Sequence, residues 1–183
     1  AKIYKALETD KGVERAMNKI KELCANDNCV FWSAGAQPPE LLVSGEVVMA
    51  TGWNGRFFGA EVGEGAPIKQ VWDGQGLDYE YFVQVKGGPN DANGKALKAL
   101  AMMTNTEMLA GSAKYIAYAP WRKSSIAIME AGEPWYKDGK TNMVPQMPTA
   151  PQNTKNYFLV DPVFWADNGT ELGEKWEAMK AGL

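Results

Sequence analysis

The residues best placed to do chemistry in this 183-residue chain are an indole and an amide held between glycines. Trp53 and Asn54 lie in the segment Gly52-Trp-Asn-Gly55, shortly after the apolar run 46–51. Glycines on both sides predict an exposed loop, where a large indole is difficult to bury without a bound partner. An aromatic ring and an amide at the end of an apolar segment form the wall of a ligand site more readily than a reactive centre. We therefore expect Trp53 to contact a ligand.

A second group alternates carboxylates with phenol rings in the segment Asp78-Tyr79-Glu80-Tyr81. A strand sends successive side chains to opposite faces, so one face would carry Tyr79 and Tyr81 and the other Asp78 and Glu80. Aromatic faces cover alkyl chains and attract ammonium groups, each contributing about 0.5–2 kcal/mol. The alternative stays open for each residue: the rings fill a core, and the carboxylates face solvent.

The chain contains no histidine, which removes the commonest general base, the commonest zinc ligand and every Ser-His or Cys-His nucleophile. The glycine-rich segment 59–65 carries two carboxylates and lacks both the dinucleotide fingerprint and the phosphate-loop lysine. No serine stands in a nucleophile elbow, and no acid pair for a hydrolase can be placed from spacing. We therefore expect a binding protein rather than an enzyme, with no cofactor and no metal.

The two cysteines, Cys24 and Cys29, lie on either side of Asn-Asp-Asn at the end of an expected helix. This spacing allows a small disulfide loop, which is favoured in an exported protein. The alternative is a pair of unpaired thiols. Two cysteines without histidine are too few for a zinc site.

The composition is that of an ordinary globular protein, with 45% hydrophobic and 22% charged residues. A net charge of −3 and an isoelectric point near 5.1 argue against a nucleic-acid surface and slightly favour cationic ligands. No apolar run reaches the length of a membrane span, and no signal peptide opens the chain, so the sequence reads as a mature product or a fragment.

Helices and strands mix along the sequence as in an α/β protein, with strands before residue 86 and helices mainly after it. Capping residues mark two helix starts, Thr9-Asp10 and Asp161-Pro162, and Gly45 marks the end of a short helix that begins at Pro39. Asp91 is a further expected cap. The expected helices span residues 9–23, 39–45, 91–101, 106–116, 124–131 and 161–179, the expected strands 30–32, 46–51, 68–72 and 77–85, and a long loop 133–156.

The ordered set of segments resembles the solute-binding proteins of bacterial polyamine (spermidine/putrescine) ABC importers. The resemblance rests on short motifs that together span nearly the whole chain. These motifs are Ser44-Gly-Glu-Val-Val-Met-Ala50, Gly52-Trp-Asn-Gly55, Phe82-Val-Gln-Val-Lys-Gly-Gly-Pro-Asn90, Ile116-Ala-Tyr-Ala-Pro120, Asp161-Pro-Val-Phe-Trp165 and Trp176-Glu-Ala-Met-Lys-Ala-Gly182.

The resemblance implies a two-lobed α/β clamshell, the type II periplasmic-binding-protein fold, in which ligand lies between the lobes. Because family members are about twice as long, it implies that this chain corresponds to the C-terminal half. Residues 1–80 and 126–183 would belong to lobe two and residues 81–125 to lobe one.

The resemblance also implies a periplasmic receptor that delivers a small organic cation, such as a polyamine, to a membrane permease. Trp53 matches the tryptophan that packs on the polyamine chain, and Tyr79 matches a second aromatic wall residue. Tyr81 stands where polyamine binders usually carry an aspartate, and Asp78 or Glu80 is the available substitute. A carbohydrate-binding domain that uses the same aromatic residues is the alternative from a different class.

Overall fold

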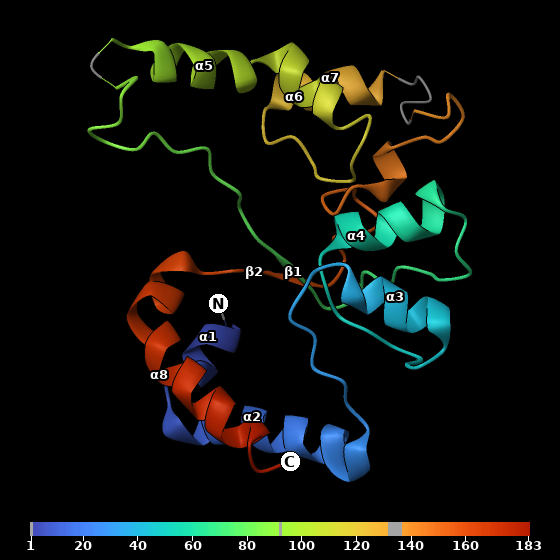
Figure 1. The fold of residues 1–183 in the computed structure, drawn as a ribbon, viewed down its shortest axis with the longest axis vertical. Helices are drawn as coiled ribbons and strands as arrows, with labels where there is room; N and C mark the ends of the chain where they lie inside the picture. Colours follow the sequence, from blue (N-terminus) through green and yellow to red (C-terminus); the bar gives the residue numbers. More distant parts are fainter. Residues whose placement is uncertain (1, 92, 132–136) are drawn as a thin grey trace. The chain divides into compact units, whose positions relative to one another are not determined.

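The computed structural model describes residues 2–91, 93–131 and 137–183. The described chain forms two compact units (Figure 1). Unit 1 contains residues 1–33, 76–78 and 158–183, and unit 2 contains residues 34–75 and 79–157. Among the described residues, no helix combines the length and the apolar character that crossing a membrane requires.

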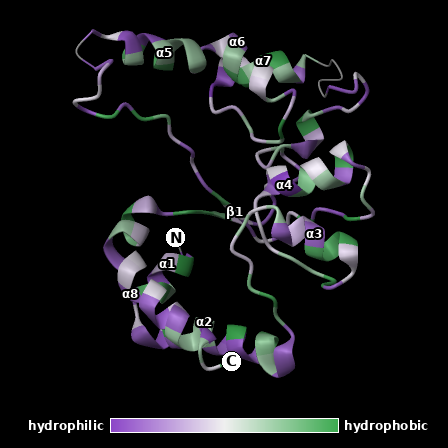
Figure 2. Cartoon of the chain, in the orientation of Figure 1, coloured by the Kyte–Doolittle hydropathy of each residue, from purple (hydrophilic) through white to green (hydrophobic). Residues whose placement is uncertain are grey.

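Unit 1 is built from three helices: α1 (Lys2–Leu7), α2 (Asp10–Cys24) and α8 (Pro162–Lys180). Helix α2 carries both hydrophilic and hydrophobic residues (Figure 2), as its periodicity predicts. The predicted caps are confirmed: the Thr9 side chain accepts from the Gly12 amide at 3.1 Å, and Asp161 Oδ1 accepts from two amides at the start of α8. Tyr4 of α1 packs on Phe164 of α8, with ring centroids 4.8 Å apart.

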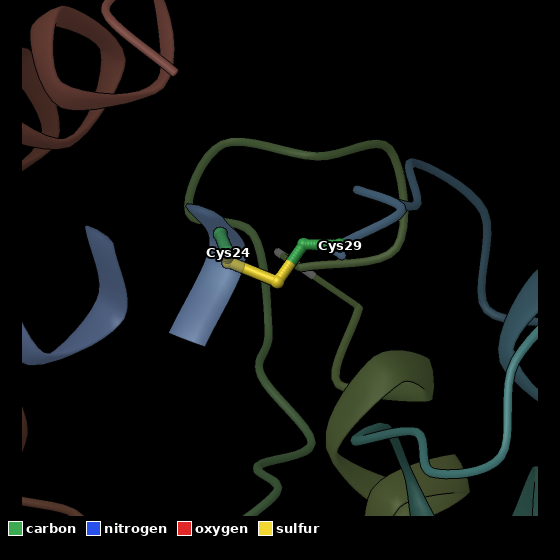
Figure 3. Close-up of a disulfide and its surroundings, with 2 residues drawn as sticks. All are labelled: Cys24 and Cys29. Carbon is green, nitrogen blue, oxygen red and sulfur yellow. A yellow bond between two sulfur atoms is a disulfide. The ribbon is translucent and has the colours of Figure 1, made fainter. Parts of the chain in front are cut away.

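A disulfide joins Cys24 to Cys29 and closes the loop that follows α2 (Figure 3). The loop begins with the 3-10 turn η1 (Ala25–Asp27) and holds two consecutive residues at positive φ, Asn26 at 60° and Asp27 at 59°. Asn and Asp tolerate this left-handed conformation better than most residues. The sequence prediction of a disulfide is confirmed.

Removing this disulfide should lower the free energy of unfolding of unit 1 by about 2 kcal/mol, because the cross-link restricts a short loop in the unfolded chain. Urea unfolding of the C24S/C29S variant, followed by circular dichroism, measures the loss. Reductant should shift the wild-type midpoint by a similar amount and leave the variant unchanged. Equal midpoints for wild type and variant would show that the cross-link contributes nothing.

Unit 2 holds the remaining helices around a core of aromatic, methionine and alanine side chains. Its helical elements are α3 (Gln37–Ser44), α4 (Asn54–Phe58), η2 (Gly59–Gly63), α5 (Lys95–Met103), α6 (Thr106–Ser112), α7 (Lys123–Glu130) and η3 (Val144–Gln146). The core residues are Phe58, Ala113, Ala117, Met129, Met143, Met147 and Ala150. Gly45 ends α3 at a φ of 77°, as predicted. Helix α6 is shorter than predicted and ends at Ser112.

The long predicted loop is present over residues 137–156, while residues 133–136 of that prediction lie outside the described part of the chain. One buried side chain organises it: Asn153 Nδ2 donates to the carbonyl oxygens of Pro145 at 2.9 Å and Met147 at 2.8 Å. These bonds hold Met143 and Met147 against the core of unit 2.

Strand β1 (Gln75–Leu77) pairs with β2 (Tyr157–Leu159) in the two-stranded sheet of the described residues. The strand predictions for 30–32, 46–51 and 68–72 are therefore wrong, and the one for 77–85 holds only for Leu77. The physical reason is that a strand needs a neighbour for its backbone hydrogen bonds, and the described chain brings none to these runs. Asp91 is also not the cap of α5. Gly94 takes that position, and the Asp91 carboxylate accepts from the Gly87 amide at 2.9 Å.

Candidate functional site

Helix α4 is fixed by one apolar and one polar contact to the segment that follows α6. Phe58, its last residue, is buried in the same core as Ala117. At its other end, Asn54 Nδ2 donates to the Ala117 carbonyl oxygen at 2.5 Å. The two contacts place residue 118 beside α4, although the two segments are far apart in the sequence. The Asn54 amide therefore positions the site.

The Tyr118 ring lies directly against the backbone of α4. A Cβ added at the buried Gly55 would lie 2.7 Å from Tyr118 Cζ and 2.9 Å from its hydroxyl oxygen. A real side chain at residue 55 would need the ring to move. Gly55 is thus required for this close approach.

Trp53 and Arg56 lie over a second glycine. A Cβ added at Gly35 would lie 2.5 Å from Trp53 Cζ3 and 3.5 Å from Arg56 Nε. Residues three apart at the start of a helix are neighbours on its surface, so the indole and the guanidinium lie on one side of α4. We refer to Trp53, Arg56 and Tyr118 together as the α4 cluster.

The electrostatics of the α4 cluster link it to Glu80. Burial raises the pKa of the Tyr118 phenol, the positive charge of Arg56 opposes the rise, and the negative charge of Glu80 adds to it. The phenol is therefore neutral at physiological pH and able to donate a hydrogen bond. Within the described residues, no carboxylate forms an ion pair with Arg56, so its charge is available to an anionic group.

The structure places the predicted residues on two segments of unit 2. Trp53 and Asn54 lie at the start of α4, and Trp53 is exposed, as the flanking glycines predicted. Glu80 lies close enough to influence Tyr118. Tyr79 and Tyr81 are exposed on the segment after β1. Residues 78–81 do not form a strand, so the strand on which the predicted opposite-face arrangement of Asp78 and Glu80 against the tyrosines rested is not present.

Two residues of the cluster were not predicted as site residues. Arg56 stands three residues after Trp53, and that helical spacing was a signal that the sequence contained. Tyr118 lies in the motif Ile116-Ala-Tyr-Ala-Pro120, but no spacing predicted its contact with α4, which follows from the buried Ala117 and the Asn54 hydrogen bond. Among the described residues, no group of three or more acidic, histidine or cysteine side chains is arranged to hold a metal ion.

A methyl group at residue 55 should destabilise the chain, while the same change at residue 59 should not. Gly55→Ala forces Tyr118 out of place and should cost about 1–3 kcal/mol in the free energy of unfolding. Gly59→Ala is the matched control: no atom lies within 4 Å of its Cβ position, its φ is −57°, and alanine should gain up to about 1 kcal/mol. Urea unfolding measures both. Equal effects would contradict the close approach of Tyr118.

Comparison with known proteins identifies the family. The family of bacterial extracellular solute-binding proteins matches residues 2–148 of this chain. A gamma-aminobutyric acid-binding protein of Pseudomonas aeruginosa is 37% identical over 179 residues, which cover 98% of this chain and 47% of that protein. The chain thus spans about half the length of this curated relative.

Solved structures show the same fold. The periplasmic binding protein MotA of A. tumefaciens, in complex with glucopine, matches with a TM-score of 0.76 at 27% identity, over 96% of this chain and 51% of MotA. An ABC transporter substrate-binding protein of Bradyrhizobium japonicum matches with a TM-score of 0.70 at 26% identity, over 91% of this chain and 48% of that one.

These matches confirm two predictions from the sequence. The fold is that of the periplasmic binding proteins, represented over part of its length. The similar proteins are solute-binding proteins and not enzymes. The chain belongs to the family of bacterial extracellular solute-binding proteins.

Proposed function

We propose that this chain supplies one wall of the ligand site of an ABC-importer receptor, and that its ligand is a small zwitterion with a carboxylate and an ammonium group. The observation that carries the proposal is the α4 cluster, in which an Arg56 guanidinium without an ion-pair partner among the described residues lies beside an exposed indole.

Arg56 is the proposed anchor of the ligand carboxylate. A guanidinium presents donors in a planar fork that matches both carboxylate oxygens. The neutral Tyr118 hydroxyl, which lies against the same helix, is a further donor for that group. Support comes from the name of the Pseudomonas aeruginosa relative, since gamma-aminobutyric acid has a carboxylate at one end and an amine at the other.

The remaining residues suit the other end of such a ligand. Glu80 is the proposed partner of the ammonium group, because its negative charge raises the pKa of Tyr118 in the α4 cluster and so lies near it. The indole of Trp53 would cover the alkyl chain between the two charges. Tyr79 and Tyr81, which flank Glu80 in the sequence and are exposed, are proposed as additional aromatic contacts.

The polyamine predicted from the sequence is the second candidate. Trp53 and Glu80 suit a diamine as well as a zwitterion. A polyamine has no anionic group for Arg56, however, and like charges repel. The zwitterion is therefore the better fit to the described residues.

Titration with matched small molecules tests the ligand class. Addition of gamma-aminobutyrate should shift the backbone amide NMR signals of Trp53, Arg56 and Tyr118. Butyrate and butylamine, which each lack one charge, should bind with at least about tenfold lower affinity in the same titration. NMR detects weak binding, so the chain is tested as it stands. Shifts produced by putrescine or spermidine alone would favour the polyamine, and shifts produced only by oligosaccharides would favour the carbohydrate-binding alternative.

The cellular setting forms part of the same proposal. An extracytoplasmic location, specifically the periplasm, agrees with the family and with the Cys24–Cys29 disulfide, because disulfides persist in oxidising compartments. The expected partner is the membrane permease of an ABC importer. We also propose that residues 1–80 and 126–183 belong to one lobe and residues 81–125 to the other.

A further inference from the structure

Three Asn-Gly pairs occur in the sequence: Asn54-Gly55, Asn93-Gly94 and Asn168-Gly169. In such a pair the backbone nitrogen of the glycine can attack the side-chain carbonyl carbon of the asparagine, because glycine has no side chain to hinder the approach. The attack requires an asparagine side chain folded towards the following peptide and a glycine amide that is free to turn. The structure meets these requirements at one pair and opposes them at the other two.

Hydrogen bonds hold two of the three asparagine side chains away from this reaction. Asn54 Nδ2 donates to the Ala117 carbonyl oxygen at 2.5 Å, and the Gly55 that follows is buried in α4. Asn168 Nδ2 donates to the Phe164 carbonyl oxygen at 2.9 Å, so its side chain reaches back along α8. The glycine amide after it lies inside α8, where the helix uses its N–H. In both pairs the helix must open before the glycine nitrogen can attack.

Asn93 is exposed and lies in the turn that precedes α5. Its Oδ1 accepts from the Lys95 amide at 3.0 Å, so the side chain is folded over the Gly94 peptide. A hydrogen bond to this oxygen also draws electrons from Cγ, which makes that carbon a better target for a nucleophile. The Gly94 amide donates to the Asp91 carbonyl oxygen at 3.2 Å, which is at the long end for such a bond. Opening this one turn frees the nitrogen, and an exposed turn opens at little cost in free energy.

We propose that Asn93-Gly94 is a site of spontaneous deamidation in the folded chain, and that its two products affect the start of α5 in opposite ways. The Gly94 nitrogen gives its proton to water and bonds to Asn93 Cγ, the Cγ–Nδ2 bond breaks, and Nδ2 leaves as ammonia with a proton from water. Water then opens the resulting succinimide ring. Opening at Cγ gives aspartate, and opening at the main-chain carbonyl carbon gives isoaspartate. Overall, an amide and one water become a carboxylate and an ammonium ion.

The two products offer different groups to the first turn of α5. That turn, residues 95–98, contains no acidic residue, and its N-cap is Gly94, which has no side chain. Aspartate at residue 93 keeps an acceptor for the Lys95 amide and adds a negative charge near the helix N-terminus, which is favourable. Isoaspartate adds a carbon to the backbone, so the Lys95 contact and the turn to Asp91 cannot both be kept. All nine residues of α5 are at least partly exposed, which makes the helix sensitive to changes at its end.

Mass spectrometry of the chain, aged in buffer at physiological pH, tests the site. The tryptic peptide 87–95 should exchange an amide for an acid at Asn93 at least about tenfold faster than peptides 22–56 and 156–175, which carry the other two pairs. In urea the three rates should converge, because no helix then protects the other pairs. Asn93→Gln should leave peptide 87–95 unmodified. Equal rates in the folded chain, or continued modification of peptide 87–95 in Asn93→Gln, would overturn the proposal.

NMR of α5 tests the opposite effects of the two products. Ion-exchange chromatography separates the deamidated chain from the unmodified one, and electron-transfer fragmentation distinguishes isoaspartate from aspartate within it. In the Asn93→Asp variant the Cα chemical shifts of residues 95–98 should move away from random-coil values. In the isoaspartyl form they should move towards those values. Equal shifts for the isoaspartyl form and the Asn93→Asp variant would contradict the proposal.

Discussion

Arg56→Met should weaken binding of gamma-aminobutyrate by about 30- to 150-fold, which corresponds to about 2–3 kcal/mol for the loss of a charged hydrogen-bond pair. Methionine keeps an unbranched side chain of similar length next to Trp53 and removes only the fork of donors. The free energy of unfolding should change little, because Arg56 is exposed and has no ion-pair partner among the described residues. NMR titration of both proteins under the same conditions provides the two affinities.

Two further variants separate the role of the fork from that of the charge. Arg56→Lys keeps the charge without the planar donors, so its affinity should lie between those of wild type and Arg56→Met. Arg15→Met, at an exposed position of α2 in unit 1, removes the same charge from the protein and should leave affinity unchanged. For putrescine, Arg56→Met should bind as well as wild type or better, because a repulsive charge is gone. A drop in putrescine affinity that matches the drop for gamma-aminobutyrate would contradict carboxylate recognition by Arg56.

Local signals predicted α2, α3 and α8, because caps and breakers act within a few residues, whereas α1 and α4 were not predicted. Thr9 and Asp161 each accept from amides of the helix that follows, and Gly45 ends α3 with a positive φ. All three effects depend on the backbone and on one nearby side chain. The disulfide is similarly local, because Cys24 and Cys29 are separated by a single turn.

The strand predictions failed because a strand depends on pairing with residues far away in the sequence. The run 46–51 has the composition of a buried strand, but burial requires neighbouring strands and covering helices. The described chain pairs only β1 with β2. Val48 and Val83 are exposed because no strand or helix of the described chain covers them.

The candidate site was predicted only in part, because some of its contacts also depend on residues far apart in the sequence. Trp53 stood out through its flanking glycines, which are a local signal. Tyr118 comes to α4 through the burial of Phe58 and Ala117 in one core, which no spacing in the sequence reveals. The site therefore depends on the packing of unit 2, and residues that hold that packing affect it from a distance.

Asn153 is a buried polar side chain that supports this packing, and Asn153→Ala should lower the free energy of unfolding by about 1–3 kcal/mol. The buried amide donates to the carbonyl oxygens of Pro145 and Met147, so alanine removes two hydrogen bonds, although the Met147 carbonyl still accepts from the Ala150 amide. These acceptors belong to the loop that carries Met143 and Met147 into the core with Phe58. Urea unfolding measures the loss. The Trp53 and Tyr118 amide signals should also broaden or shift, because α4 is held by the same core.

A variant of a second asparagine and a second variant of Asn153 test whether the Asn153 amide organises the loop. Asn156→Ala removes an exposed amide that donates to Asp73, and it should cost no more than about 0.5 kcal/mol. Asn153→Asp replaces the donor by a carboxylate that faces two carbonyl oxygens, which should raise its pKa in the folded state above its unfolded value. The proton then binds more tightly to the folded chain than to the unfolded chain. The loss in free energy of unfolding of this variant relative to wild type should therefore shrink as the pH falls through the raised pKa and grow as the pH rises. A defect that is independent of pH, or equal losses for Asn153→Ala and Asn156→Ala, would show that the amide of Asn153 does not organise the loop.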